Sequence, residues 1–306
     1  MVKLAGQQAV GTSFEIVLRG LLARKWTILF GALFLAIPTG MYAFLQPDVY
    51  RAEALVAPVG SEGEGIGRTL DQLGSLSMLA SLGGIGLGVG GISKNVIALE
   101  TLKSRAFVVG FIQEHDLLVP VMAGSSWDME KGVLRLNGDW YDTDAQQWVR
   151  KVRQGQSVSP TDAEAYAEFS DMLSVTLSRD TGLVTIAVEF VSPVIAKQWV
   201  DWLIIDINES MRRSDLDEAE RSIEYLKQQI ELAQITGIRH ALYQLVEDQT
   251  QKMMLTKVRP EYVYKTIDPA VVPEKKERPR RITMTVLSTI LGALLASLWI
   301  VVNIKK

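Results

Sequence analysis

The sequence predicts a membrane protein with two transmembrane helices and an α+β domain between them. Two uncharged apolar segments, Trp26–Leu45 and 282–302, are each long enough to cross a hydrocarbon core of about 30 Å at about 1.5 Å per residue. The intervening 236 residues carry 26 of the 32 Lys and Arg and 34 of the 35 Asp and Glu, a net charge of −8. Strand-like alternation and helical periodicity both occur within this segment.

Residues 1–25 predict a cytoplasmic amphipathic N-terminus. Ser13 can cap a helix whose apolar stripe consists of Phe14, Val17, Leu18, Leu21 and Leu22. About 25 residues precede the first apolar segment, and no small-x-small cleavage site follows it, so we do not expect a cleavable signal peptide.

The charges that flank the apolar segments predict the orientation. Four basic residues and one acid, Glu15, precede the first span, which places the amino terminus in the cytoplasm. Two spans then return residues 303–306 to the cytoplasm, where Lys305 and Lys306 agree with the same rule. Five basic residues before the second span oppose this orientation, but long loops translocate largely regardless of charge. These are Lys275, Lys276, Arg278, Arg280 and Arg281.

Several strands are expected in the domain 46–281. Residues 49–58 alternate and end at a proline, and 175–179 with 183–190 predict a hairpin across a Gly-containing turn. Residues 262–267 predict a final strand that pairs with 49–57 near the bilayer.

Helices are expected at 93–118, at 144–153 and at 161–173, the last with the capping-box spacing of Thr161 and Glu164. Residues 60–91 hold 11 of the 24 glycines. They predict either a membrane-proximal or subunit-contacting mobile loop, or a flexible surface loop with one short helix.

A long helical segment is predicted at about 193–257. Its apolar residues are spaced alternately by three and four, as in the seam of a coiled coil. The seam residues are Leu216, Ala219, Ile223, Leu226, Ile230 and Ala233. Gly237 interrupts the pattern, so the segment forms either one helix of 40 or more residues or two stacked helices. Such a length must project from the membrane, with the seam buried against the same chain or another subunit.

A proline-rich strut is predicted at 259–281, where four of the ten prolines occur. Proline fixes φ and removes an amide donor, so Pro269, Pro273 and Pro279 indicate an extended, stiff segment ahead of the second span.

Small residues four apart lie in both apolar segments, where they let helix backbones approach closely. Such faces favour packing within or between subunits, and we expect them to form a contact with a membrane partner. They are Ala32, Ala36 and Gly40 in the first segment, and Ser288, Gly292 and Ala296 in the second.

The sequence offers few residues for catalysis. There is no cysteine, which excludes disulfides and thiolate metal sites, and the two histidines, His115 and His240, lie far apart in predicted helices. No HExxH, GxSxG or P-loop motif occurs. The Gly-rich run 83–88 follows no strand of a βαβ unit, so it does not predict a dinucleotide site. We expect no enzyme, cofactor, metal site or nucleic-acid partner.

The chain resembles the Wzz-type chain-length determinants, the polysaccharide co-polymerases of bacterial envelopes. The resemblance is carried by the basic-aromatic lead-in 18–26, by 97–107 with its Leu-Lys-Ser-Arg run, by the Val-Ser-Pro at 191–193, and above all by 259–281 with Asp-Pro-Ala-Val-Val-Pro at 268–273. It extends over nearly the whole chain.

The resemblance implies an inner-membrane protein with both termini in the cytoplasm and an α+β periplasmic domain. That domain would have a membrane-proximal mixed sheet and a long extended helix. The chain would assemble as a homo-oligomeric ring or bell and act on a membrane polymerase. It would thereby set the length of O-antigen or a related glycan, with contact to the growing lipid-linked glycan possible.

Two alternatives stand beside this hypothesis. A capsule or exopolysaccharide export adaptor with a separate cytoplasmic tyrosine kinase would share the topology. A two-span sensor would need a cytoplasmic signalling module, which the four residues after the second span do not supply.

Overall fold

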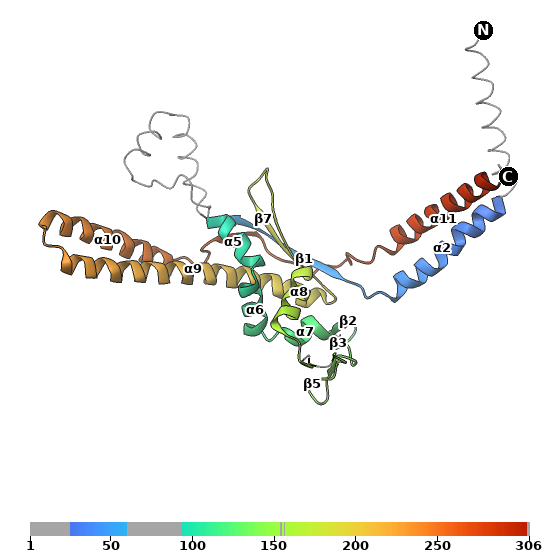
Figure 1. Ribbon diagram of the computed structural model, residues 1–306, viewed down its shortest axis with the longest axis horizontal. Helices are drawn as coiled ribbons and strands as arrows, with labels where there is room; N and C mark the ends of the chain where they lie inside the picture. The colour runs from blue at the N-terminus through green and yellow to red at the C-terminus, as the bar shows by residue number, and fades with distance from the viewer. Residues whose placement is uncertain (1–24, 60–93, 154, 156, 305–306) are drawn as a thin grey trace, which may run out of the picture. The chain divides into compact units, whose positions relative to one another are not determined.

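The computed structural model describes residues 25–59, 94–153, 155 and 157–304. The chain forms two compact units, Met1–Val49 with Lys276–Lys306, and Tyr50–Lys275 (Figure 1). The predictions made for 1–24 and for the glycine-rich segment 60–91 lie outside the described residues.

The first unit contains two apolar helices, α2 (Lys25–Leu45) and α11 (Arg281–Ile304), packed side by side. Both are long and apolar enough to cross a membrane. Large apolar side chains such as Phe34 and Ile282, each 80% exposed, point away from the helix pair. This is the arrangement expected of helices whose outer faces meet lipid. The two predicted apolar helices are confirmed.

The second unit contains a four-stranded sheet in the order β6-β7-β1-β8. Its strands are β1 (Tyr50–Pro58), β6 (Leu173–Leu177), β7 (Val184–Phe190) and β8 (Tyr264–Asp268). The predicted hairpin and the predicted pairing of the last strand with β1 are confirmed. The α+β class is also confirmed, but all three pairings are antiparallel, where a mixed sheet was expected.

The hydrophobic core lies between this sheet and the first half of helix α9 (Pro193–Leu232). Ser192 caps the helix by accepting a hydrogen bond from Ile195 N, and Pro193 occupies the first turn, where no amide donor is needed. Trp199 of α9 is fully buried, with its ring centroid 4.5 Å from that of Phe190 in β7. Each large apolar side chain buried in this way contributes about 1.5–3 kcal/mol.

The single helix expected at 93–118 is wrong. The segment forms α5 (Lys94–Lys103) and α6 (Arg105–Glu114), and α7 (Leu118–Ala123) follows. Ser104 has an extended backbone and its hydroxyl accepts a hydrogen bond from Phe107 N, so it caps a new helix instead of continuing the first.

Helix α8 (Asp162–Met172) begins with the predicted capping box of Thr161 and Glu164. The helix expected at 144–153 is wrong, because β5 (Gln147–Trp148) pairs there with β4 (Tyr141–Asp142). The Asp142 carboxylate accepts hydrogen bonds from the amides of Asp144 and Ala145, a local turn that competes with helix. A second small hairpin joins β2 (Gly124–Asp128) to β3 (Val133–Leu136).

The segment predicted as a long helix at about 193–257 forms two stacked helices, α9 and α10 (Thr236–Val258). The interpretation as one helix is wrong, and the alternative of two is correct. Ala233 and Ile235 have extended backbones, so the chain reverses there. Gly237, which we took as the interruption, lies within the first turn of α10.

Candidate functional site

The α9–α10 hairpin contains the predicted seam. Ala219 and Ile230 are buried, and the other four seam residues are half-buried, namely Leu216, Ile223, Leu226 and Ala233. The less exposed positions of α10 repeat with similar spacing. These are Leu242, Val246, Thr250, Met253 and the buried Thr256. Because α9 and α10 pack against each other, the seam is covered largely within the chain.

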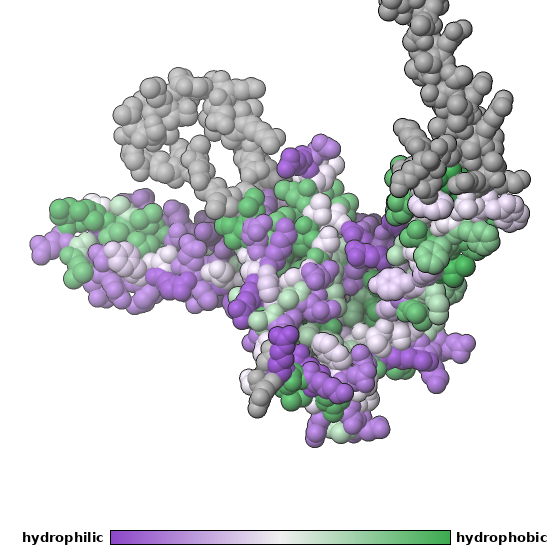
Figure 2. Space-filling model, turned by 45° about the vertical axis from the view of Figure 1, so that its right-hand side comes forward, coloured by the Kyte–Doolittle hydropathy of each residue, from purple (hydrophilic) through white to green (hydrophobic). Residues whose placement is uncertain are grey.

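Large apolar side chains nevertheless remain exposed along the same hairpin. Hydrophobic residues gather at its free end (Figure 2). Leu232, Ile235 and Ile238, at the turn, are 51–72% exposed. Further along, the exposed apolar residues are Tyr225, Tyr243, Leu245, Met254, Leu255 and Val258. A gathering of exposed apolar side chains such as the one at this turn is a candidate interaction surface on a folded protein.

The small residues of the two apolar helices meet each other inside one chain. A Cβ added at Gly292 would lie 2.5 Å from the Gly31 carbonyl oxygen, and one added at Gly31 would lie 2.6 Å from Ala296 Cβ. Ala32 and Ser288 are buried in the same contact, while Ala36 is half-buried.

Helix α2 of the same chain therefore covers the α11 face that we expected to meet a partner. Gly40 lies farther along this contact, where an added Cβ would stand 3.4 Å from Thr285 Cγ2. Gly31, the position of closest approach, was missed by sequence reasoning because the four-residue spacing was counted from Ala32.

Asp48 links the segment that follows α2 to the segment that leads into α11. Its carboxylate accepts hydrogen bonds from Arg281 Nη2 at 2.8 Å and from Lys276 Nζ at 3.0 Å. Arg281 also donates to the Ala43 carbonyl, and Arg280 pairs with Glu277 at 2.6 Å. Three of the basic residues that opposed the orientation rule are thus paired with carboxylates.

The prolines of the predicted strut lie after β8, which ends at Asp268. Pro269 and Pro273 belong to the larger unit and Pro279 to the helical unit. The described residues between β8 and α11 form no helix and only an isolated bridge, Val49 to Arg278. The stiffness of this segment remains a prediction.

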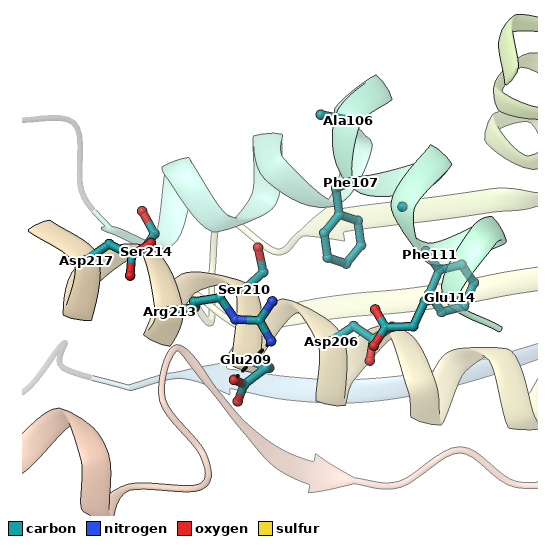
Figure 3. A pocket seen from close by; sticks show the side chains of 11 residues that line it. Ala106, Phe107, Phe111, Glu114, Asp206, Glu209, Ser210, Arg213, Ser214 and Asp217 are labelled. Carbon is teal, nitrogen blue, oxygen red and sulfur yellow. Dashed lines mark hydrogen bonds and ion pairs between the residues drawn. The ribbon is translucent and has the colours of Figure 1, made fainter.

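A groove of about 410 Å³ lies between α6 and α9 (Figure 3). Phe107 and Phe111 form its apolar wall, and α9 contributes Asp206, Glu209 and Arg213, the last two as an ion pair at 3.5 Å. Two carboxylates of the groove therefore already have partners, because Glu209 pairs with Arg213 and Asp206 lies 2.8 Å from His115 Nε2.

Burial raises the pKa of Asp206, an effect that the contact with His115 opposes. The His115 ring stacks on Trp202 with the ring centroids 4.3 Å apart. This arrangement holds α6 against α9. Among the residues that the structure describes, no group of three or more His, Cys, Asp or Glu could hold a metal ion.

A second hollow of about 680 Å³ lies beside the β4–β5 hairpin and the start of α8. Arg150 and Glu164 form an ion pair on its wall, with Arg150 Nη1 and Nη2 at 3.0 and 2.8 Å from the two carboxylate oxygens. The Arg150 guanidinium and the Thr161 amide lower the pKa of Glu164 to about 2. Sequence reasoning missed this hollow because its residues come from a segment expected to be helical.

Asn208 is a further residue that the sequence did not reveal. It is buried in α9, and its side chain makes five hydrogen bonds, four of them to the backbone around the start of β8. Nearby, Asp215 of α9 accepts hydrogen bonds from Lys94 and from the Tyr262 hydroxyl. Burial raises the pKa of Asp215, but these two donors outweigh it, so the net shift is downward.

The comparisons with known proteins point to one family. The model of the Wzz chain length determinant protein matches residues 14–115, which are 102 of the 306 residues. No curated protein matches the chain.

Three solved structures are similar to the chain. A full-length bacterial polysaccharide co-polymerase is 12% identical, with a TM-score of 0.35 over 94% of this chain and 96% of that one. A fragment of WzzB, the polysaccharide co-polymerase from Salmonella Typhimurium, is 9% identical, with a TM-score of 0.32 over 76% of this chain and all of that one. A mutant of the Shigella flexneri lipopolysaccharide O-antigen chain-length regulator is 8% identical, with a TM-score of 0.20 over 75% of this chain and all of that one.

With TM-scores this low, the three structures add no weight to the assignment, which rests on the family match. That match includes the basic lead-in 18–26 and the segment 97–107, two of the motifs that carried the resemblance. It confirms the resemblance of the chain to the Wzz family of chain-length determinants over residues 14–115.

Proposed function

We propose that this protein regulates the length of a surface polysaccharide, O-antigen or a related glycan built from lipid-linked repeats. It would act as an oligomeric scaffold on a membrane polymerase. The observation that carries the proposal is the match of residues 14–115 to the chain-length determinant family. The two apolar helices, which precede and follow the α+β unit in the sequence, fit such a role.

A scaffold without catalytic activity can set a polymer's length only by biasing the enzyme that makes it. It must contact some states of the polymerase more favourably than others, or hold the growing chain. The chain would therefore contribute a rigid periplasmic domain, a defined assembly and a membrane surface that meets the polymerase. Members of the family are regulatory scaffolds rather than enzymes, which supports this mechanism.

We further propose a two-pass topology in the bacterial inner membrane, with both termini in the cytoplasm and residues 46–281 in the periplasm. The basic residues before the first span support this orientation. Reporter fusions within 161–173 should report the periplasm, and fusions after Lys306 should report the cytoplasm. The reverse pattern would exclude both the topology and the proposed function.

Assembly into a homo-oligomeric ring or bell completes the proposal. The exposed apolar side chains of the α9–α10 hairpin, such as Leu232, Ile235 and Val258, are a surface that a second copy would cover. Because the small faces of α2 and α11 pack against each other, contact with the polymerase is proposed for the lipid-facing sides of the same helix pair.

The proposed function is tested by deleting the gene and separating surface glycans by length on a gel. Deletion should leave the glycan in place but without its preferred length, and a plasmid-borne copy should restore that length. An unchanged distribution would contradict the proposal. Loss of exported polysaccharide with O-antigen length unchanged would favour the export-adaptor alternative.

A further inference from the structure

A cluster of charged side chains lies at the ends of the two apolar helices. It consists of Asp48, just after α2, and of Lys276, Glu277, Arg280 and Arg281, which precede or begin α11. We call these five residues the juxtamembrane cluster, and all of them belong to the helical unit. Its three cations are among the basic residues that oppose the orientation rule, and the function proposed above assigns them no role.

The cluster keeps an excess positive charge when each of its carboxylates has been paired. Lys276 Nζ and Arg281 Nη2 both donate to the same oxygen, Asp48 Oδ1, at 3.0 and 2.8 Å. One carboxylate therefore neutralises only one of these two cations. Arg280 and Glu277 form a second pair, at 2.6 Å, which adds no net charge. The surrounding sequence does not cancel the excess, because the segment 274–281 carries five cations and two carboxylates.

Arg281 is held in place, whereas the other two cations reach solvent. Arg281 Nε donates to the Ala43 carbonyl at 3.1 Å, and its guanidinium lies 4.9 Å from the ring centroid of Phe44. The side chains of Lys276 and Arg280 are 37% and 71% exposed. Ion pairs this exposed are weak, so both cations can turn to a stronger anionic partner. The positive end of the α11 dipole favours an anion at the same place.

The surface beside the cluster is apolar. Phe44 and Leu45 at the end of α2 and Ile282 at the start of α11 are 75–80% exposed. A ligand at this position meets cations on one side and the outer faces of two membrane-length helices on the other. An anionic phospholipid matches both surfaces. A free phosphate ion would gain nothing from the apolar surface, and a zwitterionic phospholipid brings a cation of its own that opposes the excess charge.

We propose that the juxtamembrane cluster binds the headgroup phosphate of an anionic phospholipid. Lys276 and Arg280 donate charge-assisted hydrogen bonds to the phosphate oxygens, and Arg281 holds Asp48 beside them. The acyl chains lie along α2 and α11. A lipid bound in this way fixes the depth of the helix pair in the leaflet. The inference goes beyond the proposed function, since it requires only that the two helices lie in a bilayer.

The test measures lipid binding to the full-length protein in a neutral detergent by native mass spectrometry. The probes are dioleoylphosphatidylglycerol, which is anionic, and dioleoylphosphatidylcholine, which is zwitterionic and has the same acyl chains. Inorganic phosphate serves as a competitor. The test variant is Lys276→Gln/Arg280→Gln, in which Arg281 still holds Asp48. The matched control is Arg221→Gln/Lys227→Gln, which removes the same two kinds of charge from exposed positions of α9.

The wild type and the control should bind phosphatidylglycerol about tenfold or more tightly than phosphatidylcholine. Each cation near a membrane surface favours an anionic lipid by a factor of about five, so the test variant should lose about tenfold or more of its affinity for phosphatidylglycerol. Inorganic phosphate in large excess should leave the lipid bound, because it has no acyl chains. The melting temperature of the test variant should match that of the control.

Equal affinity of the wild type for the two lipids would overturn the proposal. So would a test variant that binds phosphatidylglycerol as tightly as the wild type does. Displacement of the lipid by inorganic phosphate would assign the cluster to a free anion and overturn the proposal as well. If the test variant unfolds, the selectivity of the wild type between the two lipids, and its decrease with added salt, still decide the question. The deletion phenotype tests the proposed function independently, so either can fail while the other stands.

Discussion

The side-chain amide of Asn208 makes two hydrogen bonds with the backbone of Tyr264, one from its N–H and one to its carbonyl. Tyr264 N donates to Asn208 Oδ1 at 2.9 Å, and Asn208 Nδ2 donates to the Tyr264 carbonyl at 3.0 Å. The same Oδ1 accepts from Tyr262 N at 3.0 Å and Val263 N at 2.7 Å. One buried side chain of α9 thus fixes the start of the edge strand β8.

Replacing Asn208 with Ala should destabilise the protein by about 2–4 kcal/mol, because three backbone amides and one carbonyl would lose a buried partner. Chemical unfolding of the full-length protein would measure this loss. Gln228→Ala, an exposed amide on the same helix, should change stability by less than about 0.5 kcal/mol. An Asn208→Ala variant as stable as the control would show that the β8 connection does not depend on this side chain.

The amphipathic patterns explain why much of the fold was predictable. In β1, alternate residues such as Ala52, Ala54 and Val56 are buried, while β7 is buried at most of its positions, including three in a row at 186–188. The capping box at Thr161 acts through neighbouring residues only. Signals of this kind depend on neighbouring residues and on which face of an element is buried, so they can be recognised in the sequence alone.

The features that sequence reasoning missed depend on partners far away in the sequence, or on local hydrogen bonds that compete with the helix. Nothing in the sequence around Asn208 indicates that its side-chain oxygen accepts a hydrogen bond from a backbone amide 56 residues later. Ser104 is one serine in an apolar helical pattern, and its hydroxyl bond to Phe107 N decides the break. Arg150 belongs to a segment expected to be helical, and its role appears only when Glu164 and the 157–159 carbonyls surround it.

The seam of the α9–α10 hairpin is tested by Ile223→Asp. Ile223 is half-buried, so an unpaired carboxylate there should cost about 1–3 kcal/mol and weaken packing of α10 on α9. A lower melting temperature and a loss of oligomers in sizing experiments are expected. Tyr225→Asp, at a position 61% exposed, should leave the melting temperature nearly unchanged. An Ile223→Asp variant with wild-type melting and assembly would show that the seam faces water.

The contact between α2 and α11 is tested by Gly292→Leu/Ala296→Leu. Side chains added at Gly292 would meet the Gly31 carbonyl and Ala32 Cα, so the helices must separate. Insertion should persist because hydrophobicity rises, while the surface glycan should be made without its preferred length. Val286→Leu, on the exposed side of α11, should preserve the wild-type length. A wild-type length distribution in the double variant would show that close packing of this pair is not required.

The Arg150–Glu164 pair predicts a dependence of stability on pH. The folded pKa of Glu164, about 2, lies below the unfolded value of about 4.3. The pair therefore stabilises the fold fully above the unfolded pKa, and the contribution disappears as pH falls through the folded pKa. The difference in stability between wild type and Glu164→Gln should be constant near neutral pH and shrink between about pH 4.3 and 2. A difference independent of pH across that interval would contradict the ionised pair.

Our proposal is that this chain biases a polymerase and does not itself make or cut glycan. The most direct measurement reconstitutes the purified membrane polymerase and lipid-linked repeats in vesicles, with and without this protein, and counts the repeats per product chain. We expect a broad distribution of chain lengths from the polymerase alone, and a narrow one around a preferred length when the protein is present. We expect no product from this protein and the substrate alone. An unchanged distribution, or sugar transfer or hydrolysis by this protein alone, would contradict the proposed function.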